Sequence, residues 1–369
     1  MKKVRIGIVG CGGIANGKHL PSIKANADLA EVVGFCDILR DRAEKAAKEY
    51  GSDDAKVYTD YHEMLKDKSI DTIHVCTPNV AHCPITVASF AAGKNVMCEK
   101  PMAHCTSDAK KMLDAWHRSG KKFTIGYQNR FREDTSTLYD SCKHGELGDI
   151  YFAKAHALRR RAVPTWGVFP NKKLQGGGPL IDIGTHALDI TLWMMNNYQP
   201  KSVTGQVFYK LGRQENGPEG NVFGPWDPKT FEVEDSAFGF IKMENGATIY
   251  LETSWALNVL LSKEASCTLC GTKGGAHINH GGSYPKDELV YNFAKHGKLM
   301  EERISPAGVV DFFAGGASAE GVKEQKQWLT AILEDKEPVV KPEQAFVVTQ
   351  ILEGIYRSAA EKREIFFDE

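Results

Sequence analysis

The amino-acid sequence predicts an α/β protein with two domains, in which a parallel βαβ sheet comes first and an open, mostly antiparallel sheet follows. Three observations lead to this prediction. The chain has 369 residues, more than one hydrophobic core usually serves. Over residues 4–126, short β-branched runs alternate with helical patterns, and from residue 127 longer alternating strands follow with fewer crossovers. We therefore expect domains at 1–126 and 127–369, and leave open whether a C-terminal helix packs back on the first domain.

The first domain is expected to alternate strands with helices. The strand pattern covers Val4–Val9, Glu31–Cys36, Lys56–Tyr58, Thr72–Cys76, Asn95–Cys98 and Phe123–Gly126. The helical pattern covers Arg40–Tyr50, Tyr61–Lys66, Val80–Ala92 and Ser107–Ser119. Such alternation is typical of a parallel sheet that carries helices on its faces.

The second domain is expected to be built from longer strands. These are Ile150–Ala157, Ser202–Tyr209, Ser236–Met243, Ala247–Thr253 and Ala265–Leu269. Asn245 and Gly246 carry a hairpin signal between two of them, which favours antiparallel pairing. Helical patterns cover Ala187–Asn196, Val322–Glu334 and Pro342–Ala360, and residues 211–231 form a long loop rich in Gly and Pro.

Charge and cysteine content favour a small-molecule partner. With 46 Lys and Arg against 47 Asp and Glu, no net field would draw the chain to nucleic acid or to a membrane surface. The N-terminal residues contain no long apolar segment, so we expect a cytoplasmic protein. The nine cysteines form no disulfide-like framework, and Cys267 with Cys270 is a lone C-x-x-C pair that we interpret as structural.

The first strand leads into a glycine turn that opens a helical pattern. The turn consists of Gly10, Cys11, Gly12, Gly13, Ile14 and Ala15. A first glycine permits the tight turn, a second lets the backbone approach a pyrophosphate, and a small third residue allows close packing of helix on strand. The helix N-terminus then favours the negative charge of the phosphates. The sequence therefore predicts a Rossmann dinucleotide-binding domain.

Asp37 ends the second strand, 25 residues beyond Gly12. A carboxylate there can accept hydrogen bonds from the adenosine ribose and repels a 2′-phosphate, which favours NAD over NADP. The alternative is that Asp37 caps the helix beginning near Arg40. A second turn, at the end of the fourth strand, holds Thr77, Pro78, Asn79 and His82, and we expect it to contact the cofactor because ligands bind at the carboxyl edge of parallel strands.

Three further residues suggest proton transfer at a hydroxyl group. Lys100 follows the fifth strand and precedes Pro101, where the nicotinamide should lie. Asp182 and His186 are four residues apart and share one face if their segment is helical. An imidazole with a neighbouring carboxylate suits a general base. The alternatives are a surface lysine, a capping aspartate and a core histidine.

A metal site made of Asp182, His186 and His156 has suitable ligand types but no recognisable ligand spacing. We therefore expect no metal.

These segments resemble the Gfo/Idh/MocA family of sugar and polyol oxidoreductases. The resemblance covers essentially the whole chain and rests on Gly10–Ala15, Thr77–Asn79, Glu99–Pro101, Gly177–Gly178, and Asp182, His186 and Asp189. It implies a C-terminal α/β domain whose open sheet serves substrate binding and oligomerisation. It also implies NAD as cofactor and Lys100, Asp182 and His186 as catalytic residues, with His186 as the base.

The resemblance implies further contacts. Glu99 and Gln128 lie where family members line the nicotinamide side of the cofactor. The segment Arg159–Gly167 is either a solvated basic run or a basic and aromatic wall suited to a glycosyl group or to the cofactor carboxamide, and we expect Trp166 to contact the cofactor. The residues expected to contact the substrate are Lys100, Arg130, Arg159, Asp182, Thr185 and His186.

The implied activity is NAD-dependent oxidation of a secondary hydroxyl, at C3, of a glucoside or hexose to a 3-oxo sugar. Inositol dehydrogenase is the nearest alternative, and a redox-assisted glycosidase would need the same residues. A sugar-sensing relative without catalysis is disfavoured because Lys100, Asp182 and His186 are all present. We expect a homo-oligomer, with dimer and tetramer left open.

Overall fold

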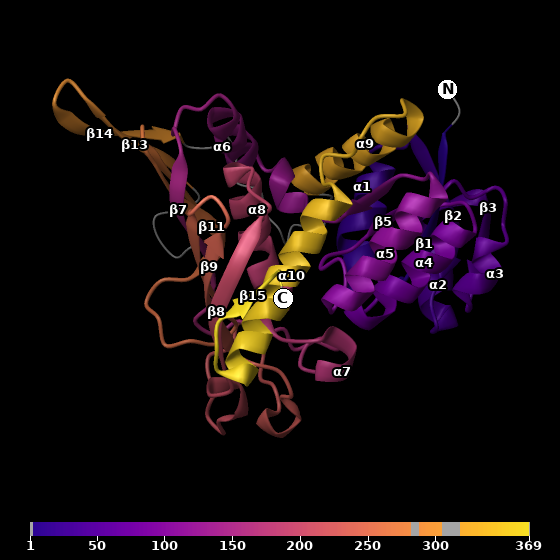
Figure 1. The fold of residues 1–369 in the computed structure, drawn as a ribbon. Helices are drawn as coiled ribbons and strands as arrows, with labels where there is room; N and C mark the ends of the chain where they lie inside the picture. Colours follow the sequence, from indigo (N-terminus) through magenta and orange to yellow (C-terminus); the bar gives the residue numbers. More distant parts are fainter. Residues whose placement is uncertain (1–2, 282–287, 305–317, 369) are drawn as a thin grey trace. The chain divides into compact units, whose positions relative to one another are not determined.

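The computed structural model describes residues 3–281, 288–304 and 318–368 (Figure 1). The chain divides into two compact units. The first holds the described residues of Met1–Phe131 and Val309–Phe346, and the second those of Arg132–Gly308 and Val347–Glu369. The expected second domain, 127–369, is therefore corrected: helix α9 (Ala319–Leu333) belongs to the first unit, because its buried side chains pack against helix α1 (Leu20–Lys24) and strand β1.

The first unit contains a six-stranded parallel sheet. Its order is β3 (Gly51–Tyr58), β2 (Ala30–Cys36), β1 (Val4–Val9), β4 (Thr72–Val75), β5 (Asn95–Cys98) and β6 (Phe123–Ile125). This is the doubly wound order of Rossmann domains, in which the strand sequence reverses beside β1. The predicted parallel sheet is confirmed, and the bounds of β1 and β5 are those expected.

Four helices accompany these strands as the sequence predicts. They are α2 (Arg40–Tyr50), α3 (Tyr61–Leu65), α4 (His82–Ala91) and α5 (Thr106–Ser119). A π-helical turn, Ala15–His19, precedes α1 directly after the glycine turn. Ala15 and Leu20 pack with Ile6, Ile8 and Phe35 in one buried cluster, which holds the start of this helix against the sheet.

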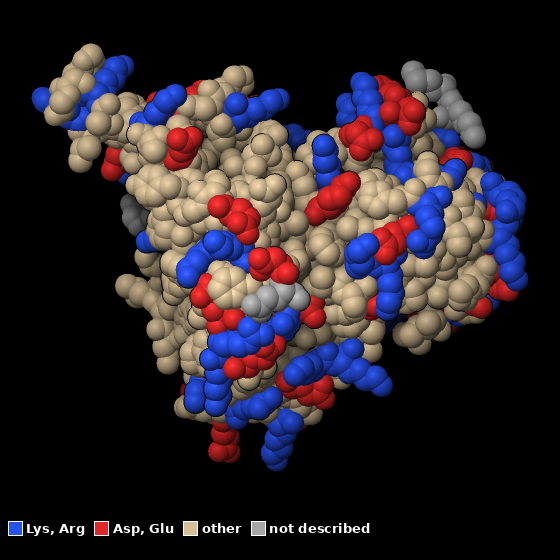
Figure 2. Space-filling model, viewed as in Figure 1, with Lys and Arg blue, Asp and Glu red and all other residues tan. Residues whose placement is uncertain are grey.

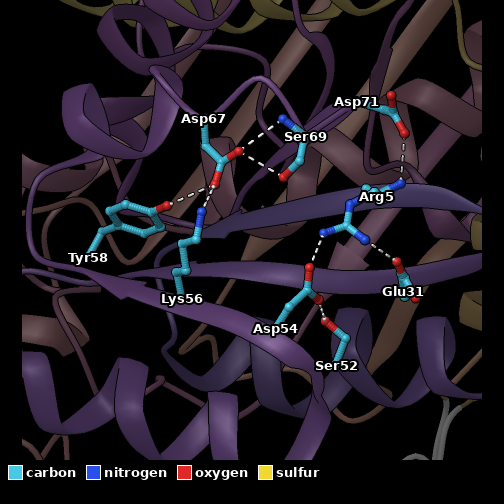
Figure 3. A network of polar contacts seen from close by, with 9 residues as sticks. All are labelled: Arg5, Glu31, Ser52, Asp54, Lys56, Tyr58, Asp67, Ser69 and Asp71. Carbon is cyan, nitrogen blue, oxygen red and sulfur yellow. Dashed lines mark hydrogen bonds and ion pairs between the residues drawn. The ribbon is translucent and has the colours of Figure 1, made fainter.

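Polar side-chain contacts join strands of this sheet (Figure 3). The Arg5 guanidinium donates to Glu31 and to Asp54, each at 2.5 Å. Asp67 accepts from Lys56 at 2.8 Å and from the Tyr58 hydroxyl at 3.2 Å. The pKa of Asp67 is lowered well below its ordinary value, chiefly by the hydrogen bond from Lys56. These contacts join side chains of β1, β2 and β3 and of the segment before β4.

The second unit contains a nine-stranded sheet (Figure 1). Its order is β14 (Lys298–Ile304), β13 (Glu288–Lys295), β12 (Gly275–Asn279), β11 (Lys263–Gly271), β7 (Ile150–Leu158), β10 (Thr248–Ser254), β9 (Ser236–Met243), β8 (Pro200–Phe208) and β15 (Ile365–Phe366). Only β7 and β10 pair in parallel among the described pairs, so the expected mostly antiparallel sheet is confirmed. Strands β12 to β15 were not predicted.

Helices cover one face of this sheet. Helix α8 (Thr185–Met195) packs on β7 and β11, and Trp193 stacks on Tyr139 of α6 (Glu133–Lys143) with ring centroids 3.8 Å apart. Helix α10 (Pro342–Glu361) brings Ile355 onto Gly205 and Gly239, where a side chain at either glycine would collide with it. A short helix, α7 (Lys172–Gln175), leads into the glycine segment before Asp182.

The long loop 211–231 is folded onto the second unit. The Asn221 side chain accepts from the N–H of Val163 at 2.8 Å and donates to its carbonyl at 3.0 Å. Trp226 is buried and donates to the Gly212 carbonyl at 2.8 Å. The loop therefore supports the segment that begins at Arg159.

The molecular surface carries both signs of charge. Lys and Arg are interspersed with Asp and Glu on the face shown in Figure 2. Within the described ranges, no helix combines the length and the apolar character that crossing a bilayer demands.

Candidate active site

The glycine turn has the geometry that a pyrophosphate requires. Gly10 has a φ of +91°, and a Cβ there would lie 2.5 Å from the Cys76 carbonyl oxygen. No atom lies within 4 Å of the Cβ positions built at Gly12 and Gly13, so the backbone is open there. Ala15 is buried against the sheet. The residues present therefore fit a dinucleotide cofactor at the start of this helix.

Asp37 lies beside this turn at the end of β2. Its Oδ2 accepts from the Cys11 N–H at 2.8 Å, and its Oδ1 accepts from the Leu39 N–H at 2.9 Å. The residue that caps helix α2 is Leu39, which makes no side-chain capping bond, so the capping alternative for Asp37 is wrong. A carboxylate has about four acceptor positions, and two remain for ribose hydroxyls.

His82 occupies a different place from the one expected. Its ring is buried, with Nδ1 2.8 Å from the Pro101 carbonyl oxygen and Nε2 3.0 Å from that of Thr77. The expected direct cofactor contact is corrected, because both ring nitrogens face protein carbonyls. His82 instead joins the turn after β4 to the turn after β5. Pro78 is exposed and Asn79 is half-buried in that first turn.

Lys100 begins the turn after β5 and is half-buried. Its backbone N–H donates to Oε2 of Glu99 at 3.1 Å, and its peptide bond to Pro101 is cis. Glu99 is buried, and its Oε1 lies 2.5 Å from Nζ of Lys18 and 2.7 Å from Nε2 of His19. The expected lining of the cofactor by Glu99 is therefore corrected: its carboxylate is committed to neighbours inside the first unit.

Gln128 and Arg130 contact different groups although they are only two positions apart. Gln128 is half-buried and its Oε1 lies 3.4 Å from Nζ of Lys18, beside the Glu99 cluster. Arg130 is 1% exposed and its Nη1 donates to Oε1 of Gln344 at 2.7 Å and to the Val339 carbonyl at 3.4 Å. The expected substrate contact of Arg130 is corrected, since its guanidinium holds the first turn of α10 and the Val339 carbonyl before it.

Asp182 and His186 lie on one continuous helical segment in the second unit. A π-helical turn, Leu180–Gly184, runs directly into α8. Both side chains are half-buried, whereas residues 183–185 between them are buried, so the two share the more open face. The N-cap position of this segment is Pro179, three residues before Asp182, and Oδ2 of Asp182 accepts from Nε1 of the buried Trp255 at 3.0 Å. The helical arrangement inferred from the spacing is confirmed, and the capping alternative is wrong.

The glycine segment before Asp182 is held by a buried carboxylate. Glu234 accepts from the N–H groups of Gly178 at 2.9 Å and Leu180 at 3.2 Å, and from the Tyr356 hydroxyl at 2.7 Å. A Cβ at Gly178 would lie 2.2 Å from the Glu234 carbonyl oxygen. Burial raises the pKa of Glu234, and the two backbone N–H groups and Tyr356 oppose that rise.

Arg159 is paired within the second unit. Its guanidinium bonds both oxygens of Glu264, and its Nη1 donates to the Ala162 carbonyl at 3.3 Å. Burial lowers the pKa of Arg159, but the charges of Glu264 and Asp182 outweigh it and raise the pKa overall. Asp182 is thus one of the groups whose charge acts on Arg159, while Arg160 is exposed.

Trp166 and Thr185 have opposite exposures. Trp166 is 51% exposed, and its ring meets Phe223 edge-on at 4.8 Å and Phe169 at 5.8 Å. The ring is thus part of an aromatic surface built with loop 211–231. Thr185 is fully buried, so its expected substrate contact is corrected.

The three residues considered as metal ligands, Asp182, His186 and His156, are not among the groups whose ligand atoms converge in the described residues. Nδ1 of His156 lies 2.6 Å from Glu252. Within residues 3–281, 288–304 and 318–368, the group with converging ligand atoms is His104, Cys105 and Asp108, and Asp108 already pairs with a lysine. All nine cysteines are free, and Cys267 and Cys270 have opposite parity along β11, so they lie on opposite faces of the strand.

Sequence reasoning missed several residues that hold the candidate site. They are Lys18, His19, Glu234, Trp255, Glu264 and Glu324. Lys18 and His19 carried a weak signal, because they follow the glycine turn by one helical turn. The others are distant in sequence from the groups they contact, and no local pattern pointed to them.

Comparisons with known proteins identify the family. Residues 4–127 match the model of the Gfo/Idh/MocA oxidoreductase family with an NAD-binding Rossmann fold, and residues 141–366 match its C-terminal α/β domain. The chain is 35% identical over 356 residues to D-glucoside 3-dehydrogenase of Escherichia coli, covering 96% of this chain and 95% of that protein. It is 30% identical over 194 residues to inositol 2-dehydrogenase of Salmonella typhimurium, covering 52% and 55%.

Solved structures share the fold. Levoglucosan dehydrogenase in complex with NADH and levoglucosan has a TM-score of 0.81 and 19% identity, with 100% of both chains covered. An aldose-aldose oxidoreductase from Caulobacter crescentus has a TM-score of 0.79 and 22% identity, with 99% of this chain and 100% of that chain covered. Together with the glycine turn and the two matched domains, these comparisons lead to one conclusion: the chain belongs to the Gfo/Idh/MocA family and is an NAD-dependent oxidoreductase.

Proposed function

We propose that this protein oxidises the C3 hydroxyl of a glucoside or free hexose with NAD, yielding a 3-oxo sugar. The observation that carries the proposal is the 35% identity over 96% of the chain to D-glucoside 3-dehydrogenase. The family match and the joint presence of Lys100, Asp182 and His186 support it.

The first unit would hold the cofactor. Gly10 to Ile14 provide the open backbone for the pyrophosphate, and Asp37 accepts from the adenosine ribose. Thr77, Pro78 and Asn79 lie at the same carboxyl edge of the sheet. When bound, NAD supplies the oxidising power, because its nicotinamide ring accepts the hydride that leaves the sugar carbon.

Three side chains manage the proton and the sugar. His186 accepts the proton of the hydroxyl as the carbonyl forms. Lys100 donates a hydrogen bond to the reacting oxygen and so favours loss of that proton. Asp182, held by Trp255 through one carboxylate oxygen, orients the sugar by accepting a hydrogen bond from one of its hydroxyls. No metal is required, since amino-acid side chains take the proton.

Arg159 and Trp166 would bound the sugar site in the second unit. Arg159 sits near Asp182 with its charge balanced by Glu264, so it can donate to a neutral sugar without leaving an uncompensated cation. The exposed Trp166 ring offers an apolar face suited to a pyranose or to an aromatic aglycone. The cofactor contact expected for Trp166 stays a prediction beside this one.

An inositol dehydrogenase is the second candidate. It is supported by the 30% identity to inositol 2-dehydrogenase, although that match covers only 52% of this chain. The same acid–base residues would serve either substrate.

A substrate panel tests the proposal. Purified protein and NAD are mixed with inositols, free hexoses, and O- and C-glucosides, and NADH absorbance and sugar mass are followed. Loss of two hydrogens confined to glucosides or hexoses is the expected result. Turnover of myo-inositol above every glucoside would establish the second candidate, and release of aglycone without net NADH would indicate a redox-assisted glycosidase.

We also propose that the protein acts in the cytoplasm as a homo-oligomer. Light scattering coupled to size-exclusion chromatography should give a mass at least twice the 40.8 kDa of the chain. A mass equal to one chain would reject that part of the proposal.

A further inference from the structure

A buried charge cluster lies under the Lys100 turn in the first unit. Nζ of Lys18 is 2.5 Å from Oε1 of Glu99 and 3.1 Å from Oε2 of Glu324. Nε2 of His19 shares the same Glu99 oxygen at 2.7 Å, and its Nδ1 is 3.2 Å from Nδ1 of His74. The cluster joins the helix after the glycine turn, the end of β5 and helix α9.

These charges are almost fully withdrawn from water. Lys18 is 6% exposed, Glu99 4% and Glu324 3%. A buried ion is tolerated only when a partner compensates it, and removing one partner of a buried pair is strongly unfavourable. Burial by itself would raise the pKa of Glu99, yet the charge of Lys18 and the contact with His19 hold that pKa well below its ordinary value. Lys18 therefore keeps Glu99 ionised.

The Glu99 carboxylate transmits this contact to Lys100. One oxygen receives Lys18 and His19, and the other accepts the backbone N–H of Lys100 at 3.1 Å. Gly126 packs close to this pair, since a Cβ there would lie 3.0 Å from Oε1 of Glu99 and 3.2 Å from Nζ of Lys18. The Glu99 carboxylate is thus held at both oxygens beside the Lys100 turn.

We propose that Lys18 is a positioning residue for Lys100: by pairing with Glu99 it fixes the carboxylate that orients the Lys100 backbone, and so sets where the Lys100 amine stands. This inference rests on the proposed function, in which Lys100 assists the reacting hydroxyl. Without the Lys18 charge, Glu99 would lie near a second carboxylate, Glu324, and its ionised form would be less stabilised. It would then take up a proton or turn, and the Lys100 turn would move with it.

If Lys18 only stabilised the fold, its loss would affect stability alone. A matched variant at another buried lysine separates a loss of stability from a loss of positioning. Lys94 is another buried lysine of the first unit, and its Nζ donates to the carbonyls of Asp67 at 2.6 Å and Ile70 at 2.8 Å. Lys94→Met removes a buried ammonium of the same kind without touching Glu99. It should lower the melting temperature while leaving kcat and the reactivity of Lys100 unchanged.

The experiment compares full-length wild type, Lys18→Met and Lys94→Met. Steady-state turnover is measured with the best sugar of the panel, and the Lys100 amine is labelled competitively with an acylating reagent and quantified by mass spectrometry. For Lys18→Met we expect kcat to fall at least about tenfold with the sugar KM changed much less, since small displacements of a catalytic group are costly. The labelling rate of Lys100 should change about threefold or more, because acylation reports the surroundings of the amine.

The outcomes are decisive in both directions. If Lys18→Met keeps wild-type kcat, or loses kcat while Lys100 labels as in wild type, the positioning role is overturned. If wild type turns over no sugar, the proposed function fails, and the labelling of Lys100 alone then decides the inference. Should Lys18→Met not fold, the double variant Lys18→Met with Glu324→Gln replaces it, because it removes the second carboxylate together with its ammonium partner.

Discussion

The indole of Trp255 donates from Nε1 to Oδ2 of Asp182 at 3.0 Å. Trp255 directly follows β10 and is fully buried, whereas Asp182 lies on the helical segment that begins at Leu180. The two residues are 73 positions apart in the chain. The bond therefore fixes one oxygen of the Asp182 carboxylate against the core of the second unit.

Trp255→Phe should lower the catalytic efficiency with the sugar, because it loosens the Asp182 carboxylate. The change keeps a buried ring but removes the donor, and a hydrogen bond to a charged group contributes about 1.5–3 kcal/mol. We expect kcat/KM for the sugar to fall about tenfold, mostly through KM. NAD affinity should stay as in wild type. Initial-rate kinetics check this, and an unchanged sugar KM would show that Asp182 does not need the indole.

Lys100→Ala and His186→Ala should each abolish most turnover. Removing the hydrogen-bond donor or the base costs about two to four orders of magnitude in kcat. NAD affinity, measured by cofactor fluorescence, should change by no more than a few fold, which separates a catalytic loss from misfolding. Wild-type rates in either variant would refute the assigned role.

Asp37→Ala should weaken NAD binding and reduce the preference of the enzyme for NAD over NADP. The carboxylate that would bond the ribose also accepts from Cys11 and Leu39, so the variant loses both charge and turn support. Asp37→Asn is the closer variant, because it keeps the shape and one of the two backbone hydrogen bonds while removing the charge that repels a 2′-phosphate. The ratio of kcat/KM for the two cofactors is the measurement. If both variants keep the wild-type ratio, Asp37 serves the turn alone.

Glu324 should make stability depend on pH. Burial, together with the neighbouring Glu99, raises its pKa from 4.5 to about 7, against the opposing effect of Lys18. The folded state therefore holds a proton that the unfolded state has released, and stability falls as pH rises from about 4.5 to 7. Relative to wild type, Glu324→Gln should gain up to about 3 kcal/mol between pH 5 and pH 8.

The measurement for Glu324 is the free energy of unfolding from denaturant titrations at several pH values. The readout is the difference between variant and wild type in the slope of the unfolding free energy against pH. The absolute free energies are not compared, because the Gln change also removes the pair with Lys18. Parallel pH profiles would show that Glu324 titrates in its ordinary range.

The sequence by itself determined the fold class and the cofactor turn. Strands β1 and β5 and helix α2 have the predicted bounds, because each has a regular apolar period bounded by turn residues. Gly10 and Asp37 were found for the same reason: parallel strands bring their carboxyl ends to one edge, so local spacing is enough to place them together. The helical relation of Asp182 to His186 also follows from spacing alone.

Only the tertiary structure decided where several of these side chains point and what holds them. Arg130, His82 and Thr185 have suitable chemistry for a site, yet each is buried against protein groups that no local pattern reveals. Strand β14 was missed because it is exposed along nearly its whole length and shows no buried face. The contacts of Trp255 with Asp182 and of Lys18 with Glu99 arise because packing joins segments that lie far apart in the chain, and residue periodicity carries no information about such partners.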